Sequence, residues 1–290
     1  MAQPLLVADV PWLLYRAFFG LPRSILGSDG APVNALLGTV NALLSATQAR
    51  PPRAVIACLG AEDAVYRKEL FPAYHAQREA MPGELASQWG QAPALLEALG
   101  WAVSESAELE ADDLMFSFVR TEAEAGGRAL LLTGDRDLFQ AVDDRVAILE
   151  LSAKGPPREV DAAEVRRRYG VGPECVPDFI ALRGDPSDNL PGAPGIGEKT
   201  ARDLLLAHGS LEGAIAASVR ERPRVGAALR EHADQLRDFR RIATLVRVDV
   251  ARPPDRPTDF ATGAEVAREL GLGRLAARLQ RLAADPPAGG

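Results

Sequence analysis

The stretch Ala129-Leu130-Leu131-Leu132-Thr133-Gly134-Asp135-Arg136-Asp137 joins an apolar run to a pair of acidic residues. A short aliphatic run that is bounded by charge and glycine is typical of a buried β-strand. Similar runs occur at Leu5–Ala8, Ala54–Leu59 and Val146–Leu151, and the first of them leads directly into Asp9. We therefore predict buried strands, some of which carry carboxylates at their carboxyl ends.

Segments with helical spacing separate these strands, at Asn34–Gln48, Gln88–Leu99 and Leu114–Ala125. Strands that alternate with helices predict a parallel sheet covered on both faces, so the fold class is α/β.

Beyond about residue 160 the strand signals fade, and the chain reads mostly as helices. We predict an α/β domain over residues 1–160 and a helical domain over residues 161–290. The helical segments are Val165–Tyr169, Val176–Leu182, Lys199–Ala207, Leu211–Ala217, Val225–Leu245 and Ala264–Ala284.

Composition narrows the class of protein. The chain has 290 residues, of which 47% are hydrophobic and 25% charged, which excludes collagen-like, coiled-coil and wholly disordered proteins. Neither a signal peptide nor an apolar run long enough for a membrane span is evident. Two cysteines are too few for a disulfide framework or a zinc cluster, so we expect a reducing cytoplasm. A net charge of −7 argues against bulk attraction to nucleic acid, unless many acids gather in one metal pocket.

Acidic residues recur where such a pocket would form. Groups at the carboxyl ends of neighbouring parallel strands converge on one crevice. Glu110-Ala111-Asp112-Asp113 opens a helix, although the helix dipole alone also favours acids there. Crowded carboxylates repel one another unless cations neutralise them, and oxygen ligands favour Mg²⁺ or Mn²⁺, with two ions about 4 Å apart. The candidate metal ligands are Asp9, Glu110, Asp112, Asp113, Asp135, Asp137, Asp185 and Asp188.

The string Gly192-Ala193-Pro194-Gly195-Ile196-Gly197-Glu198-Lys199-Thr200 leads into a predicted helix. Its glycines allow a tight turn whose backbone can approach a phosphate closely, next to a helix N-terminus. A plain turn between helices is the alternative. The expected partner is the backbone of duplex DNA, bound without base readout.

From roughly Leu5 to Ile215 the chain resembles the 5′-nuclease, or flap endonuclease, superfamily. The similarity is to the bacterial branch, which includes the N-terminal 5′–3′ exonuclease domain of DNA polymerase I and its stand-alone relatives. The motifs that carry it, in order, are Leu14-Tyr15-Arg16-Ala17-Phe18, Tyr66-Arg67-Lys68-Glu69-Leu70, Glu110-Ala111-Asp112-Asp113, Thr133-Gly134-Asp135-Arg136-Asp137 and the Gly-rich string.

This resemblance implies a PIN-like domain whose parallel sheet is flanked by helices. A helical arch over about residues 61–92 would cover the active site, and a helix–turn–helix element would grip duplex DNA, often with bound K⁺. One metal ion would be served by Asp9, Glu110, Asp112 and Asp113. A second would be served by Asp135, Asp137, Asp185 and Asp188.

The resemblance also implies roles for residues outside the acidic set. Arg16 and Arg67 would contact the scissile phosphate region, although ordinary solvated arginines are the alternative. Tyr74 would stack on a base of the single strand that passes the arch. The other expected DNA contacts are Arg78, Gly192, Gly195, Ile196, Gly197, Lys199 and Thr200.

Three departures from the family pattern affect the expected activity. Gly60 stands where the family usually carries an aspartate. His75 replaces the arch lysine and would balance phosphate charge only when protonated; a surface histidine without catalytic meaning is the alternative. Val10-Pro11-Trp12 replaces a small Gly-Ser-Ser segment.

Arginines between residues 220 and 247 are interleaved with acids. They could follow duplex phosphates or form ion pairs within a solvated helical face, and the sequence leaves both open.

We expect a stand-alone, metal-dependent 5′–3′ exonuclease or flap endonuclease that acts on duplex or branched DNA in replication or repair. It would work as a monomer without a membrane partner, and the sequence names no protein partner. A branched-DNA-binding paralogue weakened at Gly60 is the alternative. A PIN-type ribonuclease ranks third, because it leaves the Gly-rich string unexplained.

Overall fold

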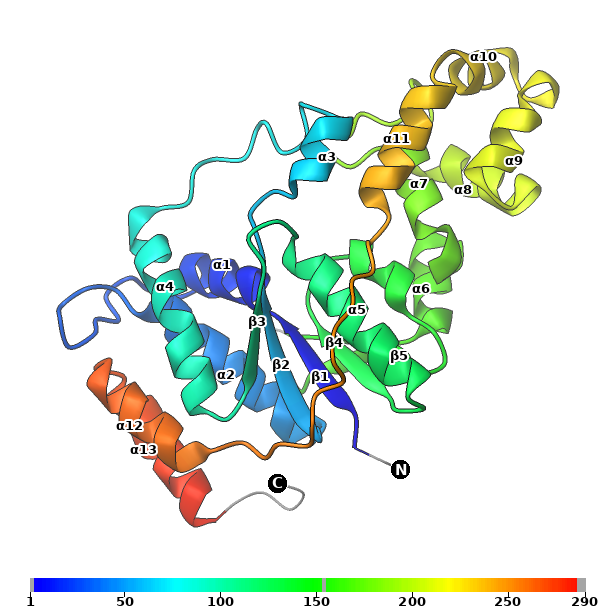
Figure 1. The fold of residues 1–290 in the computed structure, drawn as a ribbon. Coiled ribbons are helices and arrows are strands. Elements are labelled where there is room, and N and C mark those ends of the chain that lie inside the picture. The colour runs from blue at the N-terminus through cyan, green and yellow to red at the C-terminus, as the bar shows by residue number, and fades with distance from the viewer. Residues whose placement is uncertain (1–2, 153–154, 286–290) are drawn as a thin grey trace.

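A computed structural model describes residues 3–152 and 155–285. Its centre is a six-stranded sheet in the order β3-β2-β1-β4-β5-β6 (Figure 1). The predicted strands are confirmed, and two further strands flank them. The bounds are β1 Leu5–Asp9, β2 Ala54–Leu59, β3 Ala102–Glu105, β4 Ala129–Leu132, β5 Val146–Glu150 and β6 Arg158–Val160.

The sheet is parallel from β3 to β5, which confirms the predicted parallel sheet, and the additional strand β6 runs antiparallel to β5. A strand that returns through a short connection pairs antiparallel with its predecessor, whereas a parallel pair needs a long crossover. The strand order reverses between β1 and β4. Ligands of open α/β sheets bind at such a reversal, beyond the carboxyl ends of the strands.

Alternating residues of β1 supply two different cores. Leu6 and Ala8 pack with one layer of helices, and Leu5 and Val7 pack on the opposite face. The layer on the first of these faces consists of α1 Val10–Gly20, α2 Asn34–Ala49, α4 Gly83–Ala98, α12 Phe260–Glu269 and α13 Gly273–Ala284.

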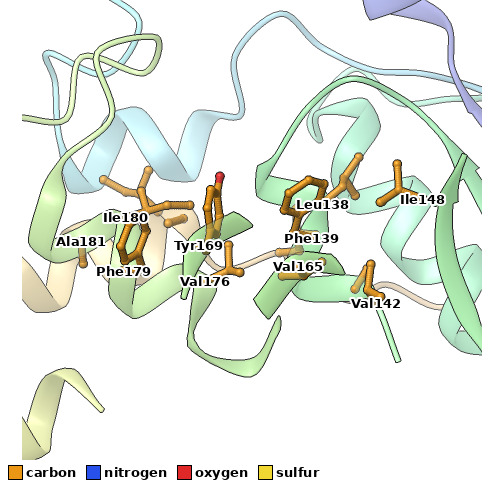
Figure 2. Close-up of a cluster of buried hydrophobic side chains, with 14 of the residues drawn as sticks. Leu138, Phe139, Val142, Ile148, Val165, Tyr169, Val176, Phe179, Ile180 and Ala181 are labelled. Carbon is orange, nitrogen blue, oxygen red and sulfur yellow. The ribbon is translucent and has the colours of Figure 1, made fainter. Parts of the chain in front are cut away.

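The second face is covered by α5 (Ala111–Glu124), and its core continues into the helical part of the chain. Figure 2 shows this continuity, from Ile148 at the sheet through Phe139 to Tyr169 and Phe179. The rings of Tyr169 and Phe179 stack with their centroids 5.0 Å apart. The elements that contribute are η1 Asp137–Ala141, α6 Ala162–Tyr169 and α7 Val176–Arg183.

Two long helices expected from the sequence are each divided. The segment 225–245 breaks at His232, which leaves the helical backbone region (φ −109°, ψ 14°). The segment 264–284 breaks at Gly271, whose positive φ of 80° favours glycine. After α6 and α7, which η2 Pro173–Cys175 connects, the helical part continues with α8 Glu198–His208, α9 Leu211–Ala216, η3 Ser218–Arg220, α10 Pro223–Glu231 and α11 Ala233–Ala243.

Residues 244–259, which we call the strap, contain no helix or strand and run from α11 back across the molecule to α12 (Figure 1). The buried carboxylate of Glu122 pairs with Arg252 of the strap and with Arg53. Beyond the strap, α12 and α13 pack with α2 and α4. The sequence did not predict this return to the first domain, and the expected division at residue 160 stays a prediction.

The expected arch region contains the short helix α3 (Val65–Leu70), turns over residues 71–82 and the start of α4. In the described part of the chain, no helix is both long and apolar enough to cross a membrane.

Candidate active site

The strand reversal places two predicted carboxylates side by side. Asp9 ends β1 and caps α1, because its Oδ1 accepts a hydrogen bond from the amide of Trp12 at 2.9 Å. Its Oδ2 accepts one from the hydroxyl of Thr133 at 2.7 Å. The same hydroxyl oxygen accepts from the amide of Asp135 at 3.0 Å. Thr133 therefore fixes the ends of β1 and β4 relative to each other.

A small pocket opens beyond these strand ends. Its acidic lining comes from Glu110, Asp112, Asp135, Asp137 and Asp188. The remaining lining residues are Arg67, Tyr74, Arg78, Ile242, Ala243 and Leu245. The sequence did not predict the last three, which come from the end of α11 and the strap; only the tertiary fold brings them here.

Burial and, to a lesser extent, mutual repulsion disfavour the charged forms of these carboxylates. Burial raises the pKa of Asp9 to about 6, and the charge of Asp135 adds to this effect. Burial raises the pKa of Asp112 well above its ordinary value, and Asp135 and Asp9 raise it further. Burial and the charge of Asp135 also raise the pKa of Asp137. A nearby cation would relieve both the desolvation and the repulsion.

The donors in this pocket are carboxylate oxygens, which suit Mg²⁺ or Mn²⁺ and not zinc. Within residues 3–152 and 155–285, no three side chains of metal-binding types converge into a ready-made cage. The chemistry of the set fits a divalent ion, and an ion would have to draw the carboxylates together.

Asp113 differs from the pocket carboxylates in its contacts, because it binds an arginine that also lies 3.2 Å from Glu110. Its side chain is fully buried and does not line the pocket. Both of its oxygens accept hydrogen bonds from the guanidinium of Arg67, each at 2.9 Å. Arg67 is itself only 3% exposed, although it lines the pocket, and its contact with the scissile phosphate region stays a prediction.

The carboxylate of Glu110 holds the arch region. It accepts hydrogen bonds from the amide of Ala64 at 2.9 Å and from the hydroxyl of Tyr74 at 3.1 Å. Tyr74 is 3% exposed, and its ring stacks on that of His75 with centroids 3.7 Å apart. The ring of Tyr74 is thus covered on one face by His75 in this conformation, and base stacking on it stays a prediction.

His75 is also buried and has a positive φ of 55°. Its Nδ1 lies 2.6 Å from Oδ1 of Asp63. Burial raises the pKa of Asp63, but hydrogen bonds with Lys68 and His75 outweigh it, and the net shift is downward. Arg78 is half-exposed at the pocket, 3.6 Å from Asp188.

Gly60 lies where the chain passes very close to the start of α5. A Cβ atom at this position would be 2.2 Å from the backbone nitrogen of Ala111 and 2.5 Å from the carbonyl carbon of Glu110. The amide of Ala61 donates to the carbonyl of Leu109 at 2.9 Å, which keeps the two segments together. Gly60 therefore lacks the usual aspartate side chain, and the surrounding backbone leaves no room for one.

Trp12 packs over Gly134 at the end of β4. A Cβ atom on Gly134 would lie 2.3 Å from the indole ring. The guanidinium of Arg16, which is exposed, lies 5.7 Å from the centroid of the same ring. Arg16 is thus free to meet a ligand near the pocket, although no contact here assigns its role.

Asp185 and Asp188 belong to the loop that precedes the Gly-rich turn. Asp185 does not line the pocket; its carboxylate pairs with Arg183 at 3.0 Å. Its backbone pairs with Leu190 across the loop. Asp188 does reach the pocket and is the member of this pair that joins the other carboxylates.

The Gly-rich turn has the shape expected of a backbone-binding element. Gly192 and Gly195 have positive φ values of 66° and 78°. Gly197 caps α8 without a side-chain hydrogen bond, which leaves the first amides of the helix available. Ile196 is buried and anchors the turn, whereas Lys199 is exposed; Thr200 is half-buried in the first turn of α8.

The arginines of the helical domain divide into two kinds. Arg237 and Arg241 pair with Asp234 and Asp238 of the same helix, which favours the ion-pair interpretation for them. Arg237 and Arg240 also pair with acids of other helices, Glu212 and Asp178. Arg224 instead lies against the turn, and its Nε would be 3.3 Å from a Cβ on Gly195.

Comparisons with known proteins agree with this geometry. A family model described as the 5'-3' exonuclease N-terminal resolvase-like domain matches residues 4–170, and one described as the 5'-3' exonuclease C-terminal SAM fold matches residues 171–258. A 5'-3' exonuclease of Streptomyces coelicolor is 36% identical, over 96% of this chain and 98% of its own length. DNA polymerase I of Mycobacterium tuberculosis is 36% identical over 88% of this chain, which spans 28% of that polymerase.

Solved structures show the same fold. A flap endonuclease of bacteriophage T5, solved in a complex with DNA and metal ions, has a TM-score of 0.71 and 18% identity, over 98% of this chain and 100% of that one. The family models, the full-length relatives and the pocket at the strand reversal all agree, and the chain belongs to the 5'-3' exonuclease family.

Proposed function

We propose that this protein is a divalent-metal-dependent nuclease that hydrolyses phosphodiesters at the 5′ ends or flaps of duplex or branched DNA. The observation that carries the proposal is the cluster of mutually repelling carboxylates at the strand reversal, one of which, Asp188, lies in the loop just before the Gly-rich turn. A T5 flap endonuclease of the same fold was solved in a complex with DNA and metal ions, which supports the proposal.

In this proposal Asp112, Asp135, Asp137 and Asp188 hold two ions, with Asp9 and Glu110 beside them. Bound Mg²⁺ or Mn²⁺ supplies positive charge, which acidifies the attacking water and stabilises the leaving oxygen. Asp135 is the most exposed of the carboxylates that line the pocket. Its substitution is therefore the sharpest test.

Two arginines are available to the substrate phosphate. Arg78 is half-exposed beside the pocket, and Arg16 is exposed near Trp12. Positive groups placed where charge develops in the transition state lower the barrier. The open amides at the start of α8, with Lys199 and Arg224, would hold the duplex backbone, and the turn would take K⁺.

The test compares cleavage of a 5′-labelled flap duplex and a blunt duplex in Mg²⁺ and in Mn²⁺. We expect Asp135→Asn to abolish cleavage and to leave DNA binding in EDTA unchanged. Asp234→Asn is the matched control, because that carboxylate is 98% exposed on α11 and should leave cleavage intact. Undiminished cleavage by Asp135→Asn would refute the assignment.

A second function has its own observation in favour. Gly60 supplies no carboxylate, and the carboxylates of Glu110 and Asp188 are already hydrogen-bonded to Tyr74 and His75. A protein whose ligands are occupied in this way would bind branched DNA and cleave it slowly. Tight, structure-selective binding without cleavage in either ion would support this alternative.

A further inference from the structure

The ion pair between Arg67 and Asp113 joins separate parts of the molecule. Arg67 lies on α3 and Asp113 in the first turn of α5. The guanidinium and the carboxylate meet through two parallel hydrogen bonds of 2.9 Å, and both side chains are almost completely buried. Such two-pronged pairs fix orientation as well as distance.

Arg67 and Asp113 also form hydrogen bonds with the backbone at the end of α11 and the start of the strap. The Nε of Arg67 donates to the carbonyl of Ile242 at 3.0 Å. Oδ1 of Asp113 accepts from the amide of Val246 at 2.8 Å. The pair therefore holds the junction between α11 and the strap, which are neighbours of α3 in Figure 1.

Gln140 on η1 holds the same junction from the other side. Its amide nitrogen donates to the carbonyl of Ala243 at 2.8 Å, and its oxygen accepts from the amide of Leu245 at 3.0 Å. The same nitrogen lies 2.9 Å from the carbonyl of Asp137. Because Ala243 and Leu245 line the carboxylate pocket, these side chains set the position of one wall of that pocket.

From these contacts we infer that Asp113 is not a metal ligand but a positioning residue, which with Arg67 and Gln140 docks the end of α11 against the carboxylate pocket. This inference rests on the proposed function only for its activity readout. Asp112, the preceding residue, is different in kind, because it lines the pocket and, among the described residues, forms no ion pair with an arginine.

The two kinds of carboxylate predict opposite effects in metal-free protein. Asp113→Asn weakens a buried pair and leaves Glu110, whose Oε1 lies 3.2 Å from Nη1 of Arg67, as the remaining carboxylate beside that guanidinium. The melting temperature in EDTA should therefore fall. Asp112→Asn removes one member of a repelling cluster, so the melting temperature in EDTA should rise. If Asp113 were a ligand like Asp112, both substitutions would shift the melting temperature upward.

Bound Mn²⁺, counted by calorimetric titration, gives a second readout that is independent of cleavage. We expect Asp113→Asn to bind as many ions as the parent and Asp112→Asn to bind fewer. Loss of an ion from Asp113→Asn would overturn the inference.

Activity gives the third readout, and Gln140→Leu keeps the inference testable if Asp113→Asn fails to fold. Both variants should lower the single-turnover cleavage rate by on the order of 100-fold with an unchanged ion count, because a small displacement of a site wall is costly. Asp234→Asn serves again as the control. A parent enzyme that does not cleave would refute the proposed function alone, since melting and ion counting would still decide the role of Asp113.

Discussion

The imidazole Nε2 of His75 lies 3.0 Å from Oδ1 of Asp188, and the backbone amide of His75 donates to the carbonyl of Asp188 at 3.2 Å. These two contacts join the arch region to the loop that precedes the Gly-rich turn. Asn189 strengthens the junction, because its side-chain amide donates to the carbonyl of Ala73 at 2.7 Å. In this conformation the arch region contacts Asp188, which is a predicted metal ligand.

Replacing His75 with alanine should open this junction. The variant loses the contacts to Asp63 and Asp188, so residues 71–82 should become more mobile. We expect trypsin to cleave after Arg78 several-fold faster than in the parent, as followed by mass spectrometry. His232→Ala is the control, because that half-buried histidine precedes α11 and its Nδ1 lies 3.3 Å from Oε1 of Gln235, outside the arch region. Equal cleavage rates for parent and His75→Ala would show that the contact does not restrain the arch region.

A side chain at Gly60 should disturb the start of α5. Gly60→Ala and Gly60→Asp both place a Cβ within 2.2 Å of the nitrogen of Ala111, so each should destabilise the fold by about 1 to 3 kcal/mol. Gly60→Asp should lower cleavage, even though it adds a carboxylate near the pocket. Urea unfolding and flap cleavage measure the two effects.

The matched control for this pair is Gly90→Ala. Gly90 is exposed within α4, and a Cβ added there would have no neighbouring atom within 4 Å, so alanine should stabilise the helix by about 1 kcal/mol. Faster cleavage by Gly60→Asp than by the parent would contradict the close packing that we describe.

The carboxylate cluster should make metal-free protein less stable as the pH rises. The folded-state pKa of Asp9 is about 6, above its ordinary value of 3.8. Because this pKa is raised, Asp9 contributes fully to the free energy of unfolding below about pH 4, where it is protonated. This contribution, about 3 kcal/mol, is lost as the pH rises through 6. Melting temperatures in EDTA from pH 4 to pH 8 should fall more steeply for the parent than for Asp9→Asn. Identical slopes would count against this electrostatic strain.

Trp12 and Gly134 should behave as a coupled pair. Gly134→Ala drives a methyl group into the indole and should cost about 1 to 3 kcal/mol. The same substitution in a Trp12→Ser background should cost much less, because the obstructing ring is gone. A double-mutant cycle of unfolding free energies measures this coupling, and strictly additive values would show that the two residues act independently.

Much of the first domain could be predicted because its strands are short aliphatic runs. Leu5–Asp9 and Ala129–Leu132 alternate between two buried faces, and such runs are readable without context. The strand β3 was missed because Ala102–Glu105 is only partly buried, and β6 because it has just three residues.

The candidate site was predictable in its acids but not in their partners. Asp9 and Asp135 follow strands, so the sheet alone brings them together. The separation of Asp113 from Asp112 depends on Arg67, which lies 46 residues away in the chain. Spacing along a helix shows which residues share a face, but it does not show which arginine from another element will contact one of them.

The return of α12 and α13 to the first domain has a consequence for the order of folding. Residues of α2 and α4 share a core with Leu275 and Leu279 near the end of the chain. During synthesis the N-terminal part of a chain emerges first, and domains fold as they are completed. Here the α/β domain begins at the N-terminus, but its core is completed only when α12 and α13 have been synthesised. The helices of the helical domain are therefore all present in the nascent chain before the α/β domain is complete.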